Sequence, residues 1–455
     1  MFDETKVLAA LTAGGGIYGE TFEEETASTL IQVESEKIEK LEKGVDSGVA
    51  LRVIVPWQTF FGSTNSREED RLIDIARELS RGGPGTNGAA AGERVPPRYP
   101  FIITARPDEV DLREKIDLVR RVESAARKME KRIRQVKVLY RDARQRVRIA
   151  GSDGMRVEDD RTQLVLTLLV VGEESGELQT AYEAIGGFCG FELFSDERVE
   201  RFVKSTVERL SGLLDAREAP MGTRTVVLAS EAGGTMIHEA IGHGLEADLA
   251  MEGLSCYKGM LGQAIAGPLI DVADDKTLPF RRGTYAYDDE GTPSQRTVLV
   301  EKGILKNYLF DRFYAMKYNM PSTANGRRES YRFKPIPRMS NTLILPGKDD
   351  PEAIIRSVDK GLLVKKMGGG QVDTVRGDFV FEIQEGYLIE DGQVGPMVRN
   401  ATMMGNGPKV LKEIDMVGND IGFGIGTCGK DGQGVPVADA QPTLRMPEII
   451  VGGRG

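Results

Sequence analysis

Apolar residues in the first part of the chain recur at the spacings of helices and strands. Residues 3–13 predict a short helix, and residues 72–79 carry the apolar stripe of another. The sequence Ser-Arg-Glu-Glu at 66–69 has the pattern of a capping box that begins this second helix. Residues 30–41 and 49–55 have strand patterns, the second because apolar residues occupy alternate positions.

A similar order of elements follows in the central part of the chain. Apolar residues at steps of three and four from Leu112 to Ile133 predict a long helix, and residues 199–214 predict another. Between them, residues 164–171 form a continuous apolar run, which is typical of a strand buried on both faces. Helix and strands therefore occur twice before residue 218, although no residue-level repeat relates the two copies.

Beyond Gly222 the chain has many short apolar runs separated by Gly, Pro, Asn and Asp, which predict a mostly antiparallel sheet. One helix is expected to interrupt it near 351–360, and a strand at 225–229 leads into a helix that carries His238. The predicted fold class is α+β. It combines an N-terminal α/β region of antiparallel strands and long helices with a C-terminal, mostly antiparallel β domain that carries the His238 helix.

Changes in composition divide the chain into four parts. Residues 82–106 are rich in Gly and Pro, which suits a linker or surface loop. This stretch separates an N-terminal α/β segment, 1–81, from a central α/β segment, 107–218. The β-rich domain is expected at 222–455. Two or three domains are usual for a chain of 455 residues.

Composition and charge exclude several classes of protein. A net charge of −10 disfavours nonspecific binding of nucleic acid, and no run approaches the roughly 18 apolar residues of a membrane span. The basic stretch 120–148 favours a solvated face over a nucleic-acid surface. Three cysteines and the lack of a signal-peptide pattern favour a reducing compartment. A soluble, cytoplasmic protein is therefore expected.

The only two histidines, His238 and His243, lie five positions apart, and Glu239 directly follows the first. Histidine is the commonest metal ligand, and a neighbouring glutamate is the usual general base of a zinc hydrolase. The spacing is H-E-x-x-x-H, so a regular helix would turn the second histidine about 140° from the first. We expect a π-type turn, or a helix end at Gly242, to bring both side chains to one site.

A third ligand must be Cys, Asp or Glu, because no other histidine is present. Cys428 ranks first among the three cysteines, since it lies in a polar, glycine-dense loop, 422–434, that can approach another element closely. Glu246 ranks second, and Asp248 is the other carboxylate alternative.

Further motifs surround these candidates. They are His-Glu-Ala-Ile-Gly-His-Gly-Leu-Glu from 238, Asn-Gly-Arg-Arg-Glu-Ser-Tyr from 325, Gly-Gly-Gly-Gln-Val-Asp-Thr from 368, Gly-Asn-Gly-Pro from 405 and Gly-Thr-Cys-Gly-Lys-Asp-Gly-Gln-Gly-Val-Pro-Val from 426. Together they resemble the TldD branch of the TldD/PmbA metalloproteases. The resemblance is specific over residues 222–455 and looser before them.

The resemblance implies a zinc-dependent peptidase in which His238, His243 and Cys428 bind Zn²⁺ and Glu239 is the catalytic glutamate. The PmbA (TldE) branch lacks the metal-binding residues, so this chain is similar to the catalytic subunit. The family further implies an enclosed site between two related subunits, reached by unfolded or small peptides. A PmbA/TldE-like partner is therefore expected, with a homodimer as the alternative.

The residues themselves favour metal-dependent hydrolysis. Zinc would polarise the scissile carbonyl and activate water, while Glu239 takes the proton of the water and delivers it to the leaving amine. An extended peptide would pair with a sheet edge, and the glycines at 368–370 could permit such pairing. Arg327 and Arg328 could hold a substrate carboxylate or an acidic group of a partner, or could be surface or ion-paired residues.

Two other functions remain open on the sequence alone. One is a peptide-binding or scaffold subunit without turnover, which would be expected to lack one of the four site residues. The other is a metal-dependent hydrolase of a non-peptide amide, because zinc and a glutamate do not by themselves select the amide. No substrate-binding residue is assigned at this stage.

Overall fold

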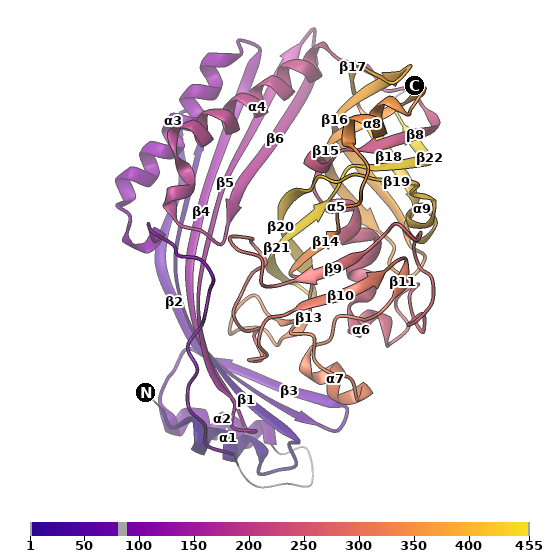
Figure 1. Cartoon of the computed structure of the whole chain (residues 1–455). Helices are drawn as coiled ribbons and strands as arrows, with labels where there is room; N and C mark the ends of the chain where they lie inside the picture. The colour runs from indigo at the N-terminus through magenta and orange to yellow at the C-terminus, as the bar shows by residue number, and fades with distance from the viewer. Residues whose placement is uncertain (1, 81–88, 454–455) are drawn as a thin grey trace.

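The computed structural model describes residues 2–80 and 89–453. Figure 1 shows two parts side by side: a tall, curved sheet with helices along its outer side, and a part built mainly of shorter strands. The N-terminus lies at the lower left of that view and the C-terminus at the upper right. The α+β fold class expected from the sequence is confirmed.

The tall sheet has six antiparallel strands in the order β3-β2-β1-β4-β5-β6. Its strands are β1 (Tyr18–Glu34), β2 (Lys37–Val55), β3 (Gln58–Thr64), β4 (Ile133–Gly151), β5 (Arg156–Glu174) and β6 (Glu177–Gly187). Strand β1 pairs with β4, from Glu20 opposite Gly151 to Glu34 opposite Lys137. The two copies suggested by the element order are therefore halves of one layer.

Two strand predictions are wrong in detail. The predicted strand 30–41 crosses the tight turn between β1 and β2, where Ser35 and Glu36 have φ angles of 50° and 66°. Apolar residues continue on both sides of this turn, so the apolar pattern of the sequence does not indicate it. Residues 164–171 lie in β5, but only alternate side chains are fully buried, because helices cover only that face of the sheet.

Helices cover both ends of the sheet. They are α1 (Glu4–Thr12), α2 (Glu69–Leu79), α3 (Leu112–Met129) and α4 (Asp196–Asp215), with 3-10 turns η2 (Pro107–Glu109) and η3 (Phe191–Phe194). Helices α3 and α4 pack on β4 and β5 through buried side chains such as Val119, Val122 and Leu210. Helices α1 and α2 form a separate small core with β2.

Two helix boundaries differ from the predictions. The predicted capping box is wrong, because α2 begins at Glu69 after an N-cap residue, Glu68, whose side chain makes no capping hydrogen bond. Ser66 Oγ instead accepts a hydrogen bond from the backbone N of Glu68 at 3.2 Å. Helix α3 ends at Met129, because the last apolar residue of the predicted stripe, Ile133, begins β4.

The second part of the molecule contains two larger sheets that share one core. The first is a mixed sheet with the order β15-β8-β22-β18-β16-β17-β7, in which an additional pairing of β15 with β16 closes five strands into a ring. The second has six strands in the order β11-β10-β9-β14-β21-β20. The strands are β7 (Arg217–Glu218), β8 (Gly222–Leu228), β9 (Val272–Asp275), β10 (Arg296–Glu301), β11 (Ile304–Leu305), β12 (Gly326–Arg327), β13 (Ile336–Pro337), β14 (Asn341–Ile344), β15 (Lys360–Val372), β16 (Asp378–Glu390), β17 (Gln393–Arg399), β18 (Ala401–Asn406), β19 (Met416–Val417), β20 (Gly422–Lys430), β21 (Gln433–Gln441) and β22 (Leu444–Gly452). Strand β20 is an edge strand of its sheet.

Several short helices interrupt these sheets. They are η4 (Ser230–Ala232), α5 (Thr235–Ile237), η5 (His238–Gly242), η6 (His243–Leu245), α6 (Ala247–Ala250), α7 (Arg312–Tyr318), α8 (Pro351–Arg356) and α9 (Gly407–Glu413). Helix α8 corresponds to the one predicted near 351–360. The expectation of a single helix is wrong, because α7 and α9 are only seven residues long and show too little periodicity in the sequence.

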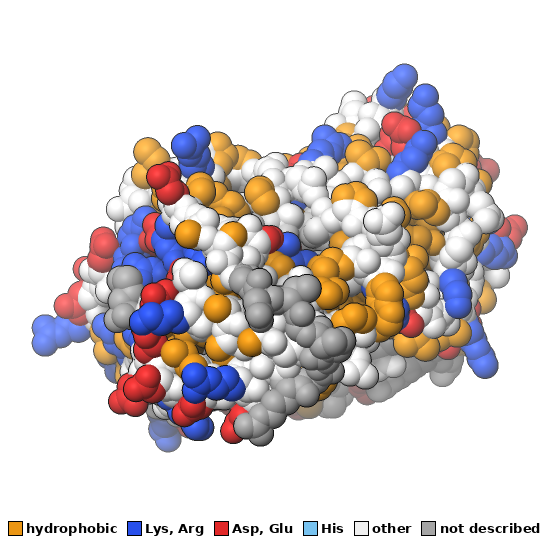
Figure 2. Space-filling view, turned by 90° about the horizontal axis from the view of Figure 1, so that it is seen from below, with side chains coloured by type: hydrophobic (Ala, Val, Ile, Leu, Met, Phe, Trp, Pro, Cys, Tyr) orange, Lys and Arg blue, Asp and Glu red, His pale blue; other side chains and the backbone are white. Residues whose placement is uncertain are grey.

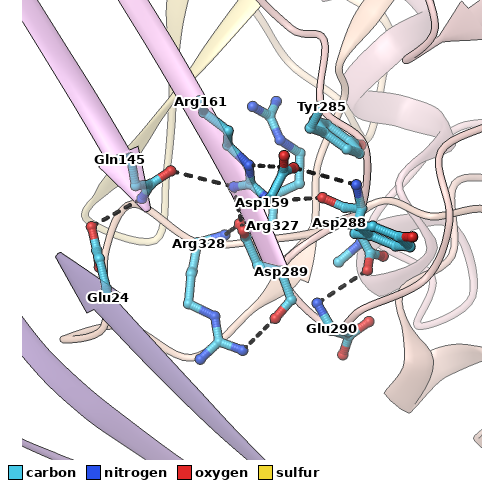
Figure 3. Close-up of polar contacts among 12 residues, drawn as sticks. Glu24, Gln145, Asp159, Arg161, Tyr285, Asp288, Asp289, Glu290, Arg327 and Arg328 are labelled. Atoms are coloured by element: carbon cyan, nitrogen blue, oxygen red, sulfur yellow. Dashed lines mark hydrogen bonds and ion pairs between the residues drawn. The ribbon is translucent and has the colours of Figure 1, made fainter. Parts of the chain in front are cut away.

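A buried network of charged side chains joins the two parts of the molecule (Figure 3). Arg161 of β5 contacts Asp159 at 3.0 Å and Asp289 at 2.6 Å. Asp289 also accepts a hydrogen bond from the backbone N of Arg328 at 2.8 Å, and the Arg328 guanidinium contacts Glu20 of β1. Breaking a buried pair leaves an uncompensated charge, so this network holds the β-rich part in a defined position on the tall sheet.

The other sequence features take ordinary structural roles. Residues 82–88 of the predicted linker lie outside the described residues. Arginines of the basic stretch 120–148 pair with carboxylates, for example Arg144 with Asp160 at 2.8 Å. On the face of the molecule shown in Figure 2, Lys and Arg side chains lie among Asp and Glu side chains. Within 2–80 and 89–453, no helix is long and apolar enough to cross a membrane.

Candidate metal centre

The segment that carries both histidines is an irregular helix. A three-residue α-turn, α5, passes into a π-turn over His238–Gly242 and then into a 3-10 turn over His243–Leu245. The centroids of the two imidazole rings lie 4.9 Å apart. The predicted break in the regular helix is confirmed, and it brings both rings to the same place.

Neighbouring side chains stabilise this irregular backbone. Tyr257 donates its hydroxyl to the carbonyl of Ala240 at 2.7 Å, and Ser255 donates to the carbonyl of Gly244 at 2.6 Å. These bonds satisfy carbonyl groups in the segment where the regular helical pattern is lost. A Cβ at Gly242 would lie 1.9 Å from the sulfur of Met339, so any larger residue there would displace the buried Met339 side chain.

Strand β20 brings Cys428 to the two histidines. Its Sγ lies 3.5 Å from Nε2 of His243, although the two residues are 185 positions apart in the chain. One donor atom from each of His238, His243 and Cys428 can be chosen so that all three lie within 4.8 Å of one another. Two imidazole nitrogens and a thiol sulfur at this separation suit a tetrahedral zinc site, which accepts such ligands.

Carboxylates hold the outer nitrogen of each ring. Asp439 Oδ1 lies 2.8 Å from His238 Nδ1, and Glu246 Oε2 lies 3.0 Å from His243 Nδ1. Each contact leaves Nε2 free to face the centre, and such carboxylates orient metal-binding histidines. Glu246, the second-ranked ligand candidate, therefore lies behind His243 and not beside Cys428.

Lys430 connects the strand of Cys428 to the carboxylate behind His243. Its Nζ lies 2.9 Å from Glu246, 2.7 Å from Asp248 and 3.0 Å from the carbonyl of Pro337. Asp248, the remaining ligand candidate, is thus engaged by a lysine. Lys430 lies two positions after Cys428, so both side chains leave the same face of β20.

Sequence reasoning did not find Asp439, Lys430 or Tyr257. Lys430 was open to inference from strand alternation around Cys428. Asp439 lies opposite Gly424 in the β20–β21 pair, and this register is not visible in the sequence. Tyr257 carries no signal that distinguishes it from other tyrosines.

The charges of the site favour a thiolate between two protonated imidazoles when metal is absent. Burial opposes a charged ring at both histidines, yet Asp439 raises the pKa of His238 well above its usual value, and Glu246 raises that of His243 to about 9. Burial raises the pKa of the Cys428 thiol, but hydrogen bonds from both histidines outweigh it and bring that pKa to about 5. A metal cation would replace the two imidazole protons in stabilising the thiolate.

Glu239 is the free carboxylate of the site. Its side chain is only partly buried, and among the described residues no hydrogen-bond partner is found for it. Burial raises the pKa of Glu239, while the two histidines oppose this change. A carboxylate with a raised pKa and no partner is suited to accept and return a proton.

A cleft of about 760 Å³ lies between the two parts of the molecule. Helix α4 and strand β6 line one side, and β15, β20 and the start of α5 line the other. It reaches Thr235, one helical turn before Glu239, and the glycines at 368 and 369, where β15 loses its regular register with β16. We call this space the large cleft; its volume is in the range of ligand-binding sites.

Arg327 and Arg328 do not line this cleft. Both are buried, and Arg327 donates to the carbonyls of Met339 at 2.6 Å and Pro436 at 2.8 Å. Arg328 belongs to the buried network shown in Figure 3. The hypothesis that they hold a substrate carboxylate is wrong, because internal acceptors engage both side chains.

Three family models match the chain. They are described as PmbA/TldA metallopeptidase domain 1, over residues 19–81, the central domain, over 105–214, and the C-terminal domain, over 221–453. The chain is 35% identical to a protein of Buchnera aphidicola named metalloprotease TldD homolog, over 90% of this chain and 87% of that one. It is 39% identical to a TldD homolog of Haemophilus influenzae, over 75% and 72% of the two chains.

More distant relatives extend the comparison. A protein of Saccharolobus solfataricus named zinc metalloprotease TldD homolog is 28% identical, over 90% of this chain and 91% of that one. A crystal structure from Thermotoga maritima, described as a putative modulator of a DNA gyrase, superposes with a TM-score of 0.80 at 20% identity, over 96% of each chain. The crystal structure of TldE from Thermococcus kodakarensis superposes with a TM-score of 0.75 at 19% identity, over 96% and 97% of the chains. These two structures share the fold.

Proposed function

This chain belongs to the PmbA/TldD metallopeptidase family, and from that premise we propose that it is a zinc-dependent peptidase that hydrolyses unfolded or small peptides. The observation that carries the proposal is the convergence of His238, His243 and Cys428, with the free carboxylate of Glu239 next to them in the chain. A scaffold subunit would have no need for this complete set.

His238, His243 and Cys428 would hold the zinc ion, while Asp439 and Glu246 orient the two rings. Bound zinc supplies a Lewis acid that polarises the scissile carbonyl and lowers the pKa of water. The relative named as a zinc metalloprotease supports the choice of metal.

Glu239 accepts a proton from the attacking water and returns it to the leaving amine. An extended peptide would lie in the large cleft, where the edge strand β20 and the glycines 368–369 offer backbone groups. Backbone pairing of this kind tolerates many side chains and requires an unfolded substrate. The three described cysteines are free thiols, which fits the proposed reducing, cytoplasmic location.

We keep the division of the chain into four segments that its composition suggests. In this proposed division, the strands and helices of the tall sheet fall within 1–81 and 107–218, the candidate metal centre falls within 222–455, and 82–106 lies between the first two. The short strand β7 at the end of the second segment pairs with β17 of the β-rich part. Residues 81–88 and 454–455 lie outside the described part of the chain.

Replacing Asp439 by Ala is expected to weaken zinc binding by roughly 10- to 100-fold, as is usual for a carboxylate that orients a metal-binding histidine. The measurement is competition for zinc with a coloured chelator. Asp415→Ala is the matched control, because Asp415 is exposed, pairs with Arg445 outside the site and should leave the affinity unchanged when replaced. Equal affinities for the two variants would show that Asp439 does not orient a zinc ligand.

We expect full activity only in a dimer whose second subunit closes the large cleft. A PmbA/TldE-like chain is favoured over a second copy, and the shared fold with TldE supports a related partner. Enclosure would also protect the open edge of β20 from unwanted pairing. Light scattering, metal analysis and cleavage of an unfolded peptide, by the chain alone and with such a partner, test this. A stable monomer with full peptidase activity, unchanged by any partner, refutes it.

Turnover distinguishes the two other functions. A metal-loaded complex that binds unfolded peptides without cleaving them would be a scaffold. Cleavage of small amides but not of peptides would indicate a non-peptide amidohydrolase.

A further inference from the structure

Arg281 places an unpaired guanidinium in the large cleft. The residue lies in the loop between β9 and β10, and its guanidinium sits over the ring of Phe423 on β20, 3.5 Å from the ring centroid. It is half-buried, and burial lowers the pKa of Arg281. Within the described part of the chain, no hydrogen bond or ion pair engages this guanidinium. A partly desolvated charge without an acceptor is costly, unless a ligand supplies that acceptor.

The charge of the large cleft is opposite to that of the whole protein. Its lining contains four basic side chains but one carboxylate, Glu183, which pairs with Lys366 at 2.6 Å. Arg198 and Arg281 have no carboxylate partner among the described residues, and Arg201 meets only an exposed glutamate at 3.7 Å. The chain as a whole carries a net charge of −10. A positive cleft in an acidic protein concentrates anionic ligands there.

The loop holds Arg281 in position before any ligand arrives. Phe280 has a φ of +62°, which is a strained conformation for a bulky aromatic residue, and its ring packs on Phe101 with centroids 4.6 Å apart. Arg282 donates to the carbonyl of Gly426 at 3.0 Å, and its own carbonyl accepts from Gln163 at 3.0 Å. Strain of this kind concentrates at functional sites, and a fixed side chain loses little entropy on binding.

We propose that Arg281 binds a carboxylate of the peptide substrate, so that the enzyme prefers peptides with an acidic side chain or a free C-terminus in the large cleft. This inference rests on the proposed peptidase function and adds the chemical class of its substrate. A guanidinium stacked on an aromatic ring still presents a planar pair of N–H donors to a carboxylate. The cleft continues from Phe423 to Thr235, one turn before Glu239, so a peptide anchored at Arg281 extends toward the proposed base.

Peptide binding tests the proposal without turnover. Fluorescence anisotropy is measured with the zinc-loaded full chain carrying Glu239→Gln, which keeps peptides intact. Three labelled unfolded peptides differ only at one residue and at the C-terminus. The first has Asp and a C-terminal amide, the second has Asn and the amide, and the third has Asn and a free C-terminus. Arg281→Gln is expected to weaken binding of the preferred anionic peptide by roughly 10- to 100-fold and to leave the neutral peptide unchanged. The two anionic peptides distinguish a side-chain carboxylate from a terminal one.

Arg120→Gln is the matched control, because Arg120 is exposed on α3, outside the large cleft, and its loss changes the net charge equally. Arg281→Lys keeps the charge but not the planar donors, so an intermediate loss is expected. Retention of the wild-type preference for anionic peptides by both Arg281 variants overturns the proposal. Displacement of the anionic peptide by an equal concentration of a ten-residue oligothymidylate also overturns it and assigns the cleft to nucleic acid.

The outcome is separable from the proposed function. If the wild-type enzyme cleaves the neutral peptide and shows no preference for anionic peptides that depends on Arg281, only the proposed carboxylate site is refuted. A wild-type protein that neither binds zinc nor cleaves any of the three peptides, alone or with a PmbA/TldE-like partner, refutes the peptidase itself.

Discussion

Replacing Glu239 by Gln is expected to lower peptide turnover by about 10²- to 10⁴-fold, while zinc content and fold stay unchanged. The carboxylate is partly buried beside His238, and no described residue competes for it through a hydrogen bond. An amide has nearly the same shape but cannot take the proton of the attacking water. Steady-state cleavage of an unfolded peptide is measured together with zinc content by mass spectrometry.

Glu231→Gln is the control for this change, because Glu231 is an exposed carboxylate on η4 only a few residues before the site. It should keep wild-type turnover. If Glu239→Gln retains turnover within a factor of about three of the wild type, the general base lies elsewhere, since removal of a base costs far more.

Replacing Cys428 by Ala is expected to remove most of the bound zinc. The loss in affinity should exceed the roughly 10- to 100-fold typical of a residue that only orients a ligand. The reason is that Cys428 supplies the only sulfur donor of the three-atom group, and its thiol has a pKa lowered to about 5. Zinc affinity is measured by chelator competition. Cobalt-substituted protein provides a second readout, because a thiolate ligand gives a sulfur-to-metal absorption band that the variant should lack.

Cys256→Ala is the control, since Cys256 is a free, partly buried thiol that is not part of the donor group. It should keep both the zinc affinity and the absorption band. Full zinc occupancy with an unchanged cobalt spectrum in Cys428→Ala would exclude Cys428 as a ligand. Glu246 would then be the next candidate, although Lys430 and the backbone N of Met339 already engage its carboxylate.

The sequence by itself determined the features that depend on local spacing. Helices α3 and α4 are long enough for their apolar period to predict them, and the fold class followed from the change of pattern at Gly222. The five-residue step between His238 and His243 required a break in the helix, because a step of five in a regular helix points away. The structure has a π-turn at that place.

The tertiary structure alone decided how distant segments meet. The turn between β1 and β2, the pairing of β1 with β4 and the register that sets Asp439 opposite Gly424 depend on contacts between strands, which an apolar pattern does not encode. The same holds for charged residues. Nothing local distinguishes Arg281, which faces the large cleft without a partner, from Arg328, which is buried against Glu20, because the environment of a charged side chain is set by the other segments packed around it.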